Sequence, residues 1–276
     1  MSTLESVSEI KKAHRILAEY NYTVPQVVHG YAGQTLYVNI SSGQIESRPV
    51  TEQMKEIFVG GKGFGLWRLW HAVTGETKWN DPENEIVIAS GPLAGAILYP
   101  GTGKSLAVGI SPLTSIVVDS NVGGYFAPLL KIAGWDALEV QGKAAEEVVI
   151  FIDGDAGRVT IEAAPLDAVD THVLTEQLTE LYAKDERDRR NISIVSAGRG
   201  SEHTRIGCLN VSWYDPKRGK VRVKQAGRGG LGTVLRDKKI KAIVVRKSGL
   251  KAEANDPVDI KRIRTVGQTI NKEIVE

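Results

Sequence analysis

Two glycine-rich turns are the most informative feature of this sequence: Asn121-Val-Gly-Gly-Tyr-Phe126 and Ala226-Gly-Arg-Gly-Gly-Leu-Gly232. Gly123 in the first turn and Gly229 in the second are 106 residues apart. Paired glycines let backbone N–H groups approach a ligand closely or take positive φ, and such turns form concave anion sites. Two related turns therefore predict a pseudo-symmetric site for a ligand with phosphates at both ends. The alternative is that the glycines only end strands and let helices pack tightly.

The turns are part of a longer internal repeat. Each copy contains a hairpin pattern, a helical stretch and a short apolar strand, in that order. These are expected at 36–47, 52–70 and 86–89 in the first copy, and at 148–161, 171–183 and 192–195 in the second. Ile88 and Ile194 in the apolar strands are again 106 residues apart. A constant offset over several elements indicates duplication, with copies at about 31–142 and 143–250.

The two ends of the chain lie outside this repeat. Residues 1–30 have a helix-like pattern and are interpreted as a helical extension that docks a partner subunit. Residues 251–276 contain a helix that starts near Asn255 and Asp256 and leads to a further domain or a separate chain. The duplicated domain itself is expected to span residues 31–250.

Composition sets looser bounds. The 276 residues are 42% hydrophobic and 25% charged, with a net charge of +2, which is ordinary for a globular protein with a substantial core. No apolar run is long enough to span a bilayer and no signal-peptide pattern is seen, so a cytoplasmic location is expected. The single cysteine, Cys208, excludes an internal disulfide framework and cannot alone supply a zinc or iron–sulfur site. We expect Cys208 to be a small buried hydrophobe.

Positive charge is concentrated beside the second glycine turn. The stretch from Lys217 to Lys247 holds twelve lysines and arginines and a single acid, Asp237. Three interpretations remain open: a solvated surface, a site or entry path for a phosphate-bearing cofactor, and a nucleic-acid surface. No aromatic residue is interleaved among these cations, so the stacking platform typical of single-strand binding is missing and nucleic acid ranks last.

One segment resembles the end of a phosphate-binding P-loop: Pro100-Gly-Thr-Gly-Lys-Ser105. The P-loop motif needs a glycine five residues before Gly103, where this chain has Leu98, and it needs a helix after the serine. The stretch from Leu106 to Ile110 instead has the pattern of a strand. A nucleoside triphosphatase is therefore a secondary hypothesis.

Other conspicuous residue types receive no chemical role. Trp67, Trp70 and Trp135 occur at helical or strand spacing and are expected in the core. No two histidines have the i, i+4 spacing of a metal-binding pair on one helix. The histidines are His14, His29, His71, His172 and His203.

Six ordered blocks give the chain a more specific resemblance. They are Gly60-Gly-Lys-Gly63, Ser90-Gly-Pro-Leu93, Gly103-Lys-Ser-Leu-Ala-Val-Gly-Ile-Ser-Pro-Leu-Thr114, Asn121-Val-Gly-Gly-Tyr-Phe126, Ala133-Gly-Trp-Asp-Ala137, and Ala226-Gly-Arg-Gly-Gly-Leu-Gly232 with Lys241-Ala-Ile-Val-Val245. Over residues 31–247 the chain resembles the N-terminal domain of tungsten-dependent aldehyde:ferredoxin oxidoreductases. The resemblance implies an α+β fold, a duplicated pseudo-two-fold unit of mixed β-sheets with flanking helices. It also implies a bis-pyranopterin (molybdopterin) tungsten cofactor supported by the two sheets.

The resemblance also implies roles for individual residues. The backbone carbonyl of Asn121 would bind a Mg²⁺ ion that bridges the phosphates of two pterins, and Gln225 would supply a second carbonyl. Lys104 and Lys224 would contact pterin or phosphate, and no catalytic residue is assigned. Mg²⁺ prefers oxygen ligands, and nearby cations balance the remaining phosphate charge. The implied cofactor-binding residues are Lys62, Lys104, Asn121, Gly123, Gly124, Tyr125, Lys224, Gln225, Gly227, Arg228, Gly229 and Gly230.

Three positions depart from the family pattern. Lys62, Lys104 and Lys224 stand where the family usually has arginine. Lysine offers a flexible point charge in place of a planar bidentate fork, so the phosphates would be held differently or less tightly. The alternative for Lys104 and Lys224 is that they are ordinary surface lysines.

The implied activity is the two-electron oxidation of an aldehyde to a carboxylic acid in anaerobic metabolism, with electrons passing through a [4Fe-4S] cluster to ferredoxin. The cluster and the catalytic acid/base residues belong to later domains of longer family chains. This chain is therefore either a fragment or one subunit of a split enzyme, and we expect an oligomer. The alternatives are a family member that reduces aromatic thioesters such as benzoyl-CoA, a non-catalytic scaffold subunit, and a P-loop-like nucleotide binder.

Overall fold

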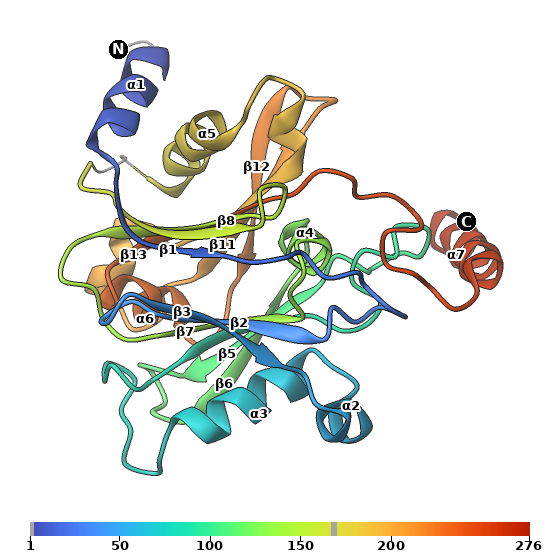
Figure 1. The fold of residues 1–276 in the computed structure, drawn as a ribbon, viewed down its shortest axis with the longest axis horizontal. Coiled ribbons are helices and arrows are strands. Elements are labelled where there is room, and N and C mark those ends of the chain that lie inside the picture. Colours follow the sequence, from blue (N-terminus) through green and yellow to red (C-terminus); the bar gives the residue numbers. More distant parts are fainter. Residues whose placement is uncertain (1–2, 167–169) are drawn as a thin grey trace.

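The computed structural model describes residues 3–166 and 170–276, and its elements follow the repeat (Figure 1). The first copy contains β2 (Gln34–Asn39), β3 (Gln44–Pro49), α2 (Glu52–Phe58), α3 (Lys62–Ala72), β4 (Ile86–Ala89), β5 (Ser105–Ile110), β6 (Val117–Val122), α4 (Phe126–Ile132) and β7 (Ala137–Gln141). The second contains β8 (Val148–Asp153), β9 (Arg158–Ala163), α5 (Thr171–Tyr182), η1 (Asp188–Asn191), β10 (Ile192–Ser196), η2 (Arg199–His203), β11 (Leu209–Asp215), β12 (Lys220–Ala226), α6 (Leu231–Asp237) and β13 (Ile240–Arg246).

The two copies build two sheets with the same strand order. The first sheet runs β3-β2-β7-β4-β5-β6, and the second runs β9-β8-β13-β10-β11-β12 with β1 (Arg15–Asn21) added outside β9. Among the described strands, β2 pairs parallel with β7 and β8 pairs parallel with β13, while the other neighbours pair antiparallel. This shared topology confirms the expected α+β fold of mixed sheets with flanking helices.

The duplication extends to individual residue pairs. Ile88 in β4 pairs with Leu138 in β7, and Ile194 in β10 pairs with Val244 in β13. Both members of the pair are shifted by 106 residues between the copies. All four side chains are buried. The offset seen in the sequence is therefore a structural equivalence.

Helices α4 and α6 lie between the two sheets (Figure 1). Helix α4, from the first copy, contacts β10, β11 and β13 of the second sheet, and α6, from the second copy, contacts β4 and β5 of the first. Helices α3 and α5 cover the outer faces. One buried cluster accordingly joins Leu36 and Ile150 from the two sheets with Phe126 from α4 and Val234 from α6. The two copies thus share one hydrophobic core.

The N-terminal segment is only partly helical. Helix α1 (Thr3–Ala13) contacts α5, but residues 15–21 form β1, which pairs antiparallel with β9. The expectation of a helical extension over residues 1–30 was therefore wrong for this stretch. The open edge of β9 supplies backbone hydrogen-bond partners, and such tertiary pairing outweighs a local helical pattern. Just beyond β1, the Tyr22 hydroxyl donates to the carbonyl of Ala133 at 2.8 Å.

The expected helix over 52–70 is broken in two. Its backbone turns between α2 and α3, where three consecutive residues have positive φ: Val59 (56°), Gly60 (151°) and Gly61 (56°). Glycine takes such values at little cost, so the Gly60-Gly61 pair ends one helix and starts the next in a new direction.

The four residues expected to be buried divide into three groups. Trp135 is fully buried as predicted, and Trp67 is partly buried with its ring centroid 6.1 Å from that of Phe58. Trp70 was wrongly placed in the core, since it is 81% exposed. It follows Leu69, one of the buried residues of α3, and consecutive helix residues point to different sides. Cys208 is only partly buried, contrary to expectation.

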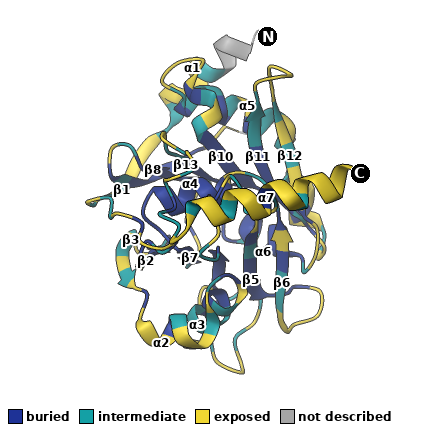
Figure 2. Cartoon of the chain, turned by 90° about the vertical axis from the view of Figure 1, so that its right-hand side faces the viewer, coloured by how far each residue is buried: buried dark blue, intermediate teal, exposed yellow. Residues whose placement is uncertain are grey.

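The C-terminal helix, α7 (Ile260–Val275), starts later than expected. Asp259 caps its first turn by accepting a hydrogen bond from the backbone N–H of Arg262 at 2.8 Å. Figure 2 shows α7 lying across one face of the domain with most of its surface exposed. Its buried residue is Gly267, which approaches the carbonyl of Leu98 closely.

Candidate functional site

The candidate site lies where the edge strands β6 and β12 of the two sheets meet. Each strand is the last in its sheet, and the two are in contact. The backbone N–H of Arg228 donates a hydrogen bond to the Oγ of Ser120 at 3.1 Å. This bond links the second glycine turn to strand β6 of the first copy. Edge strands expose unpaired backbone groups, so this junction can offer main-chain donors and acceptors to a ligand.

Asn121 and Gln225 occupy equivalent positions on these strands. Asn121 pairs with Leu106 of β5, and Gln225 pairs with Asn210 of β11. The second pair lies 104 residues after the first at both of its positions. Their side chains are engaged locally: the Oδ1 of Asn121 accepts from Lys104 Nζ at 3.2 Å, and the Nε2 of Gln225 donates to Asn210 Oδ1 at 3.4 Å. The structure therefore brings together the two residues that the resemblance paired.

A cleft of about 590 Å³ opens at this junction. It is lined by Gly101, Gly103, Lys104, Asn121, Val122, Gly123, Gly124, Lys224 and Gln225. The volume lies within the usual range of small-molecule sites. Six of the predicted cofactor-binding residues line the cleft: Lys104, Asn121, Gly123, Gly124, Lys224 and Gln225.

Glycines shape the floor of the cleft. A Cβ atom at Gly123 would lie 3.7 Å from the Nζ of Lys224, so a side chain there would fill the space beside that ammonium group. A Cβ at Gly103 would lie 2.3 Å from the carbonyl oxygen of Gly124. Gly103 belongs to one of the six sequence blocks but is not among the predicted site residues. Its sequence context does not reveal that its backbone lies so close to Gly124.

The cations at the cleft differ in how they are held. Lys104 donates to Asn121, as above. Within the described part of the chain, the ammonium of Lys224 and the guanidinium of Arg228 make no hydrogen bond or ion pair. Lys62 is placed differently, since its Nζ lies 2.6 Å from the Oδ1 of Asp119 and its charge is largely neutralised.

The remaining predicted residues lie around the cleft and do not line it. Gly229 (φ 80°) and Gly230 (φ 68°) have packing roles: a Cβ at Gly229 would lie 2.6 Å from Val118, and one at Gly230 would lie 2.2 Å from the carbonyl oxygen of Arg205. Tyr125 precedes α4 and is 43% exposed. Gly227 is exposed. For Gly229 and Gly230 the structure supports the packing interpretation.

The P-loop hypothesis fails on geometry. Ser105 begins strand β5, so no helix follows Lys104. A P-loop needs a helix N-terminus facing the phosphate, together with its ring of backbone N–H groups. Lys104 instead reaches the cleft from the start of a strand.

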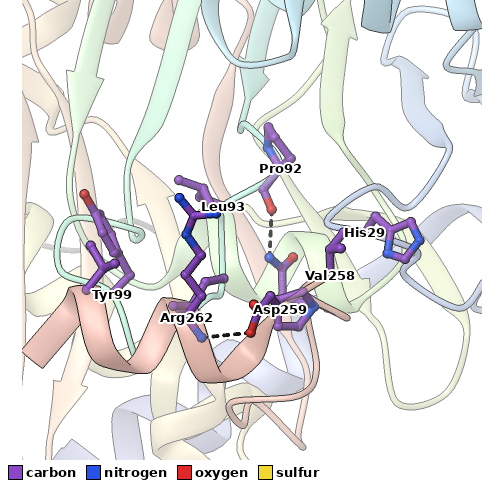
Figure 3. Close-up of a pocket in the computed structure, with 11 residues that line it drawn as sticks. His29, Pro92, Leu93, Tyr99, Val258, Asp259 and Arg262 are labelled. Atoms are coloured by element: carbon purple, nitrogen blue, oxygen red, sulfur yellow. Dashed lines mark hydrogen bonds between the residues drawn. The ribbon is translucent and has the colours of Figure 1, made fainter.

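A second pocket lies away from the glycine turns, between α7 and the loop after β4. Its volume is about 430 Å³, and its walls are mainly apolar. Figure 3 shows Arg262 pointing from α7 toward the loop that carries Leu93 and Tyr99. The buried Asn255 donates to the carbonyl of Pro92 at 2.7 Å and so anchors the segment before α7. Sequence analysis did not predict this pocket, because it depends on how the C-terminal segment folds back.

In the part of the chain that the structure describes, no helix is both long and apolar enough to cross a membrane. Among the side chains of residues 7–166 and 170–276, no group of three or more histidines, cysteines, aspartates or glutamates is arranged to hold a metal ion.

Residues 35–247 match the family described as aldehyde ferredoxin oxidoreductase, N-terminal domain. The chain belongs to this family. The match covers most of the duplicated domain, from β2 to the segment after β13. It confirms the resemblance drawn from the six sequence blocks.

Two curated relatives illustrate the range of the family. The tungsten-containing aldehyde ferredoxin oxidoreductase of Pyrococcus horikoshii is 34% identical over 218 residues, which are 79% of this chain and 33% of that protein. The WOR-like subunit of the aliphatic sulfonate oxidoreductase of Pyrococcus furiosus is 29% identical over 248 residues, 85% of this chain and 37% of that protein. This aldehyde ferredoxin oxidoreductase-family chain therefore spans about a third of the length of the curated relatives it matches.

A solved structure shows the same fold. The active-site complex BamBC of benzoyl coenzyme A reductase, in complex with 1,5-dienoyl-CoA, superposes with a TM-score of 0.67 at 29% sequence identity. The superposition covers 79% of this chain and 31% of that chain. Relatives with different named substrates thus share this domain.

The cleft fits the phosphate-bearing ends of the tungstopterin that the family implies. Gly123 leaves open a cradle that a side chain would fill, and the ammonium of Lys224 at the cleft has no carboxylate partner among the described residues. Two equivalent edge strands suit a ligand with two like halves. Main-chain oxygens with cations beside them are the donor set that a Mg²⁺–phosphate group needs.

Proposed function

We propose that this chain forms the pterin-binding domain of a tungsten-dependent oxidoreductase that converts aldehydes to carboxylic acids. The observation that carries the proposal is the equivalence of Asn121 and Gln225 on the two edge strands of a cationic cleft. The overall reaction adds oxygen from water to the aldehyde carbon and releases two electrons and two protons. The electrons would leave through an iron–sulfur cluster held by another domain or chain.

The chain's own residues would bind and orient the cofactor. Lys104 and Lys224 both line the cleft, one from each copy, and each can pair with a phosphate. The backbone carbonyls of Asn121 and Gln225 would act as ligands of a bridging Mg²⁺. When bound, the tungsten centre supplies the two-electron redox chemistry. The protein's contribution here is position and electrostatic complementarity.

Substrate choice is assigned to parts of the enzyme outside this domain. A relative named for aliphatic sulfonate and a structure of benzoyl coenzyme A reductase both share the fold. Reduction of aromatic thioesters is therefore the second candidate function. A scaffold subunit without cofactor is less well supported, because it would not require two lysines without carboxylate partners among the described residues beside an open glycine floor.

Two variants test the proposal: one removes a side chain that is not expected to bind the cofactor, and the other fills the space in which the cofactor would lie. Gln225→Ala removes a side chain but keeps the carbonyl, whereas Gly123→Val fills the cradle beside Lys224. Tungsten is measured by mass spectrometry and pterin by fluorescence of its oxidised form, on each variant purified with its partners. We expect Gln225→Ala to retain nearly the wild-type content and Gly123→Val to lose most of it, while the cofactor-free forms of both variants and the wild type unfold at the same temperature. A Gly123→Val variant that carries the full cofactor content would overturn the proposal.

A further inference from the structure

Trp213 lies on β11, directly opposite Arg222 of β12. Lys224, two residues further along β12, points to the same face of the sheet because side chains alternate along a strand. Two cations accordingly meet one indole ring. The Nζ of Lys224 lies 5.2 Å from the ring centroid and the Cζ of Arg222 lies 5.8 Å from it. Both distances are within the range of cation–π attraction.

The two cations have different electrostatic surroundings. Arg222 has a carboxylate partner, with its Nη1 lying 3.5 Å from the Oδ2 of Asp215, and Arg218 approaches the same oxygen at 2.8 Å. Lys224 has no such partner among the side chains of residues 7–166 and 170–276. Its Nζ instead lies beside Gly123, on the floor of the cleft. The charge of Lys224 is therefore available to an anion, and the ammonium packs against the indole ring of Trp213.

The first copy has no counterpart of this support. Positions equivalent by the 104-residue shift are Gly109 for Trp213 and Ser120 for Lys224. A Cβ at Gly109 would already lie 3.1 Å from the side chain of Leu231, so helix α6 occupies the space where an indole would stand. In that copy Lys104 is held by the amide oxygen of Asn121 instead. The two halves of the cleft thus hold their lysines by different means.

We propose that Trp213 is a positioning residue that holds the Lys224 ammonium over Gly123, where it binds a phosphate group of the ligand. This inference rests on the cleft described under the proposed function. The indole face limits the conformations of a flexible lysine without neutralising its charge. The ring thereby restricts the orientation of the Lys224 ammonium, as the planar guanidinium group restricts the hydrogen bonds of an arginine.

The expected effect on affinity is modest and measurable. Cation–π pairs at exposed sites correspond to a change of about two- to fivefold in binding. Trp213→Leu is expected to weaken binding by that factor, because it keeps an apolar side chain but removes the aromatic face. Trp213→Phe keeps an aromatic face and is expected to retain most of the wild-type affinity.

The test is a double-mutant cycle with magnesium pyrophosphate as the probe. Titration calorimetry is performed on protein made in a host that lacks molybdopterin synthesis. If Trp213 acts through Lys224, Trp213→Leu weakens binding in the wild-type background but has no further effect in a Lys224→Met background. Trp70→Leu is the matched control, since Trp70 is exposed on α3 and has no place in the cleft.

Three results would overturn the inference: equal effects of Trp213→Leu in both backgrounds, equal effects of Trp213→Leu and Trp70→Leu, or no binding of pyrophosphate to the wild type. The outcome is separable from that of the proposed function. If the chain purifies from its native host without tungstopterin but Trp213 and Lys224 are coupled in pyrophosphate binding, the role of Trp213 stands and the proposed oxidoreductase function is rejected. A chain that carries tungstopterin but shows no coupling loses only the role of Trp213.

Discussion

Asn121 and Gln225 are structurally equivalent residues that face one cleft from two different sheets. Each lies on the edge strand of its sheet, opposite a residue of the neighbouring strand that is shifted by the same 104 positions. Neither copy forms the cleft alone, because its walls come from both. A ligand with two similar halves therefore meets two similar backbones, which is the geometric basis of the proposed function.

Contact between the copies depends on Gly229. A Cβ at this position would lie 2.6 Å from Val118 on β6, and the backbone φ is 80°. We expect Gly229→Ala to lower the free energy of unfolding by about 2–3 kcal/mol, from backbone strain together with steric overlap. It should also lower cofactor content. The measurements are denaturant unfolding and pterin content.

Gly219 provides the matched control for this variant. It has a similar φ of 61°, in the β11–β12 hairpin, but a Cβ there would meet no atom within 4 Å. Gly219→Ala therefore carries the strain without the overlap and should leave cofactor content unchanged. Equal losses of stability and cofactor in the two alanine variants would show that contact with Val118 is unimportant.

Glu85 should make stability depend on pH. Burial, followed by repulsion from Glu139, raises the pKa of Glu85 from its ordinary 4.5 to about 8, and neither carboxylate oxygen has a hydrogen-bond partner among the described residues. The folded protein then holds a proton that the unfolded chain releases between these two pH values. The stability contributed by this group is therefore present at low pH and is lost as pH rises toward 8, by roughly 1.4 kcal/mol per pH unit at most.

The variant Glu85→Gln tests this dependence. It removes the titrating proton and should unfold with a smaller pH slope between pH 5.5 and 7.5, measured by urea titration. Burial lowers the pKa of Lys238 to about 8, so most of its titration falls above this interval. Identical slopes for the wild type and the variant would contradict the assignment.

A buried ion pair fixes the start of β2 against α4 and β7. The ammonium of Lys131 donates to the carboxylate of Asp136, and both side chains are fully buried. Asp136 also accepts from the backbone N–H groups of Ala32 at 3.1 Å and Gly33 at 2.8 Å. Lys131→Met leaves a buried carboxylate without its counter-ion and should cost about 3–5 kcal/mol. The double variant Lys131→Met/Asp136→Asn should recover part of that loss in denaturant unfolding; no recovery would show that lost packing of the lysine stem dominates.

The position of α7 depends on Gly267. A Cβ there would lie 2.0 Å from the carbonyl oxygen of Leu98. Gly267→Val should therefore displace α7 and expose residues 248–259 to limited proteolysis, while the duplicated domain unfolds at the wild-type temperature. Thr269→Val, which places the same residue type at an exposed position of the same helix, is the control. Wild-type protease resistance of Gly267→Val would show that α7 tolerates the side chain.

Much of the fold followed from the sequence because the repeat was long. The constant offset between Ile88 and Ile194 identified the two copies before any strand pairing was known, and the pairing reproduces that offset. The strand at residues 15–21 could not be predicted in this way, since it has no equivalent in the first copy and depends on the free edge of β9. Trp70 was misplaced because Trp residues are usually buried and the exposed side of α3 was not recognised.

The candidate site was only partly readable from residue patterns. Asn121 and the two glycine turns were visible as motifs; the first turn lines the cleft, whereas the second follows Lys224 and Gln225, which line it from the other copy. The pairing of Lys62 with Asp119 and the support of Lys224 by Trp213 were not predicted. The first joins helix α3 to strand β6 and the second joins the neighbouring strands β11 and β12, and local sequence does not contain that information.

The central claim is that this cleft holds a tungstopterin. The most direct measurement is the tungsten and pterin content of the chain purified from its native host together with its associated polypeptides. We expect about one tungsten and about two pterins per chain in the wild type, and little of either in Gly123→Val. A preparation that keeps its partners but contains neither tungsten nor pterin would contradict it and leave a scaffold subunit as the better description.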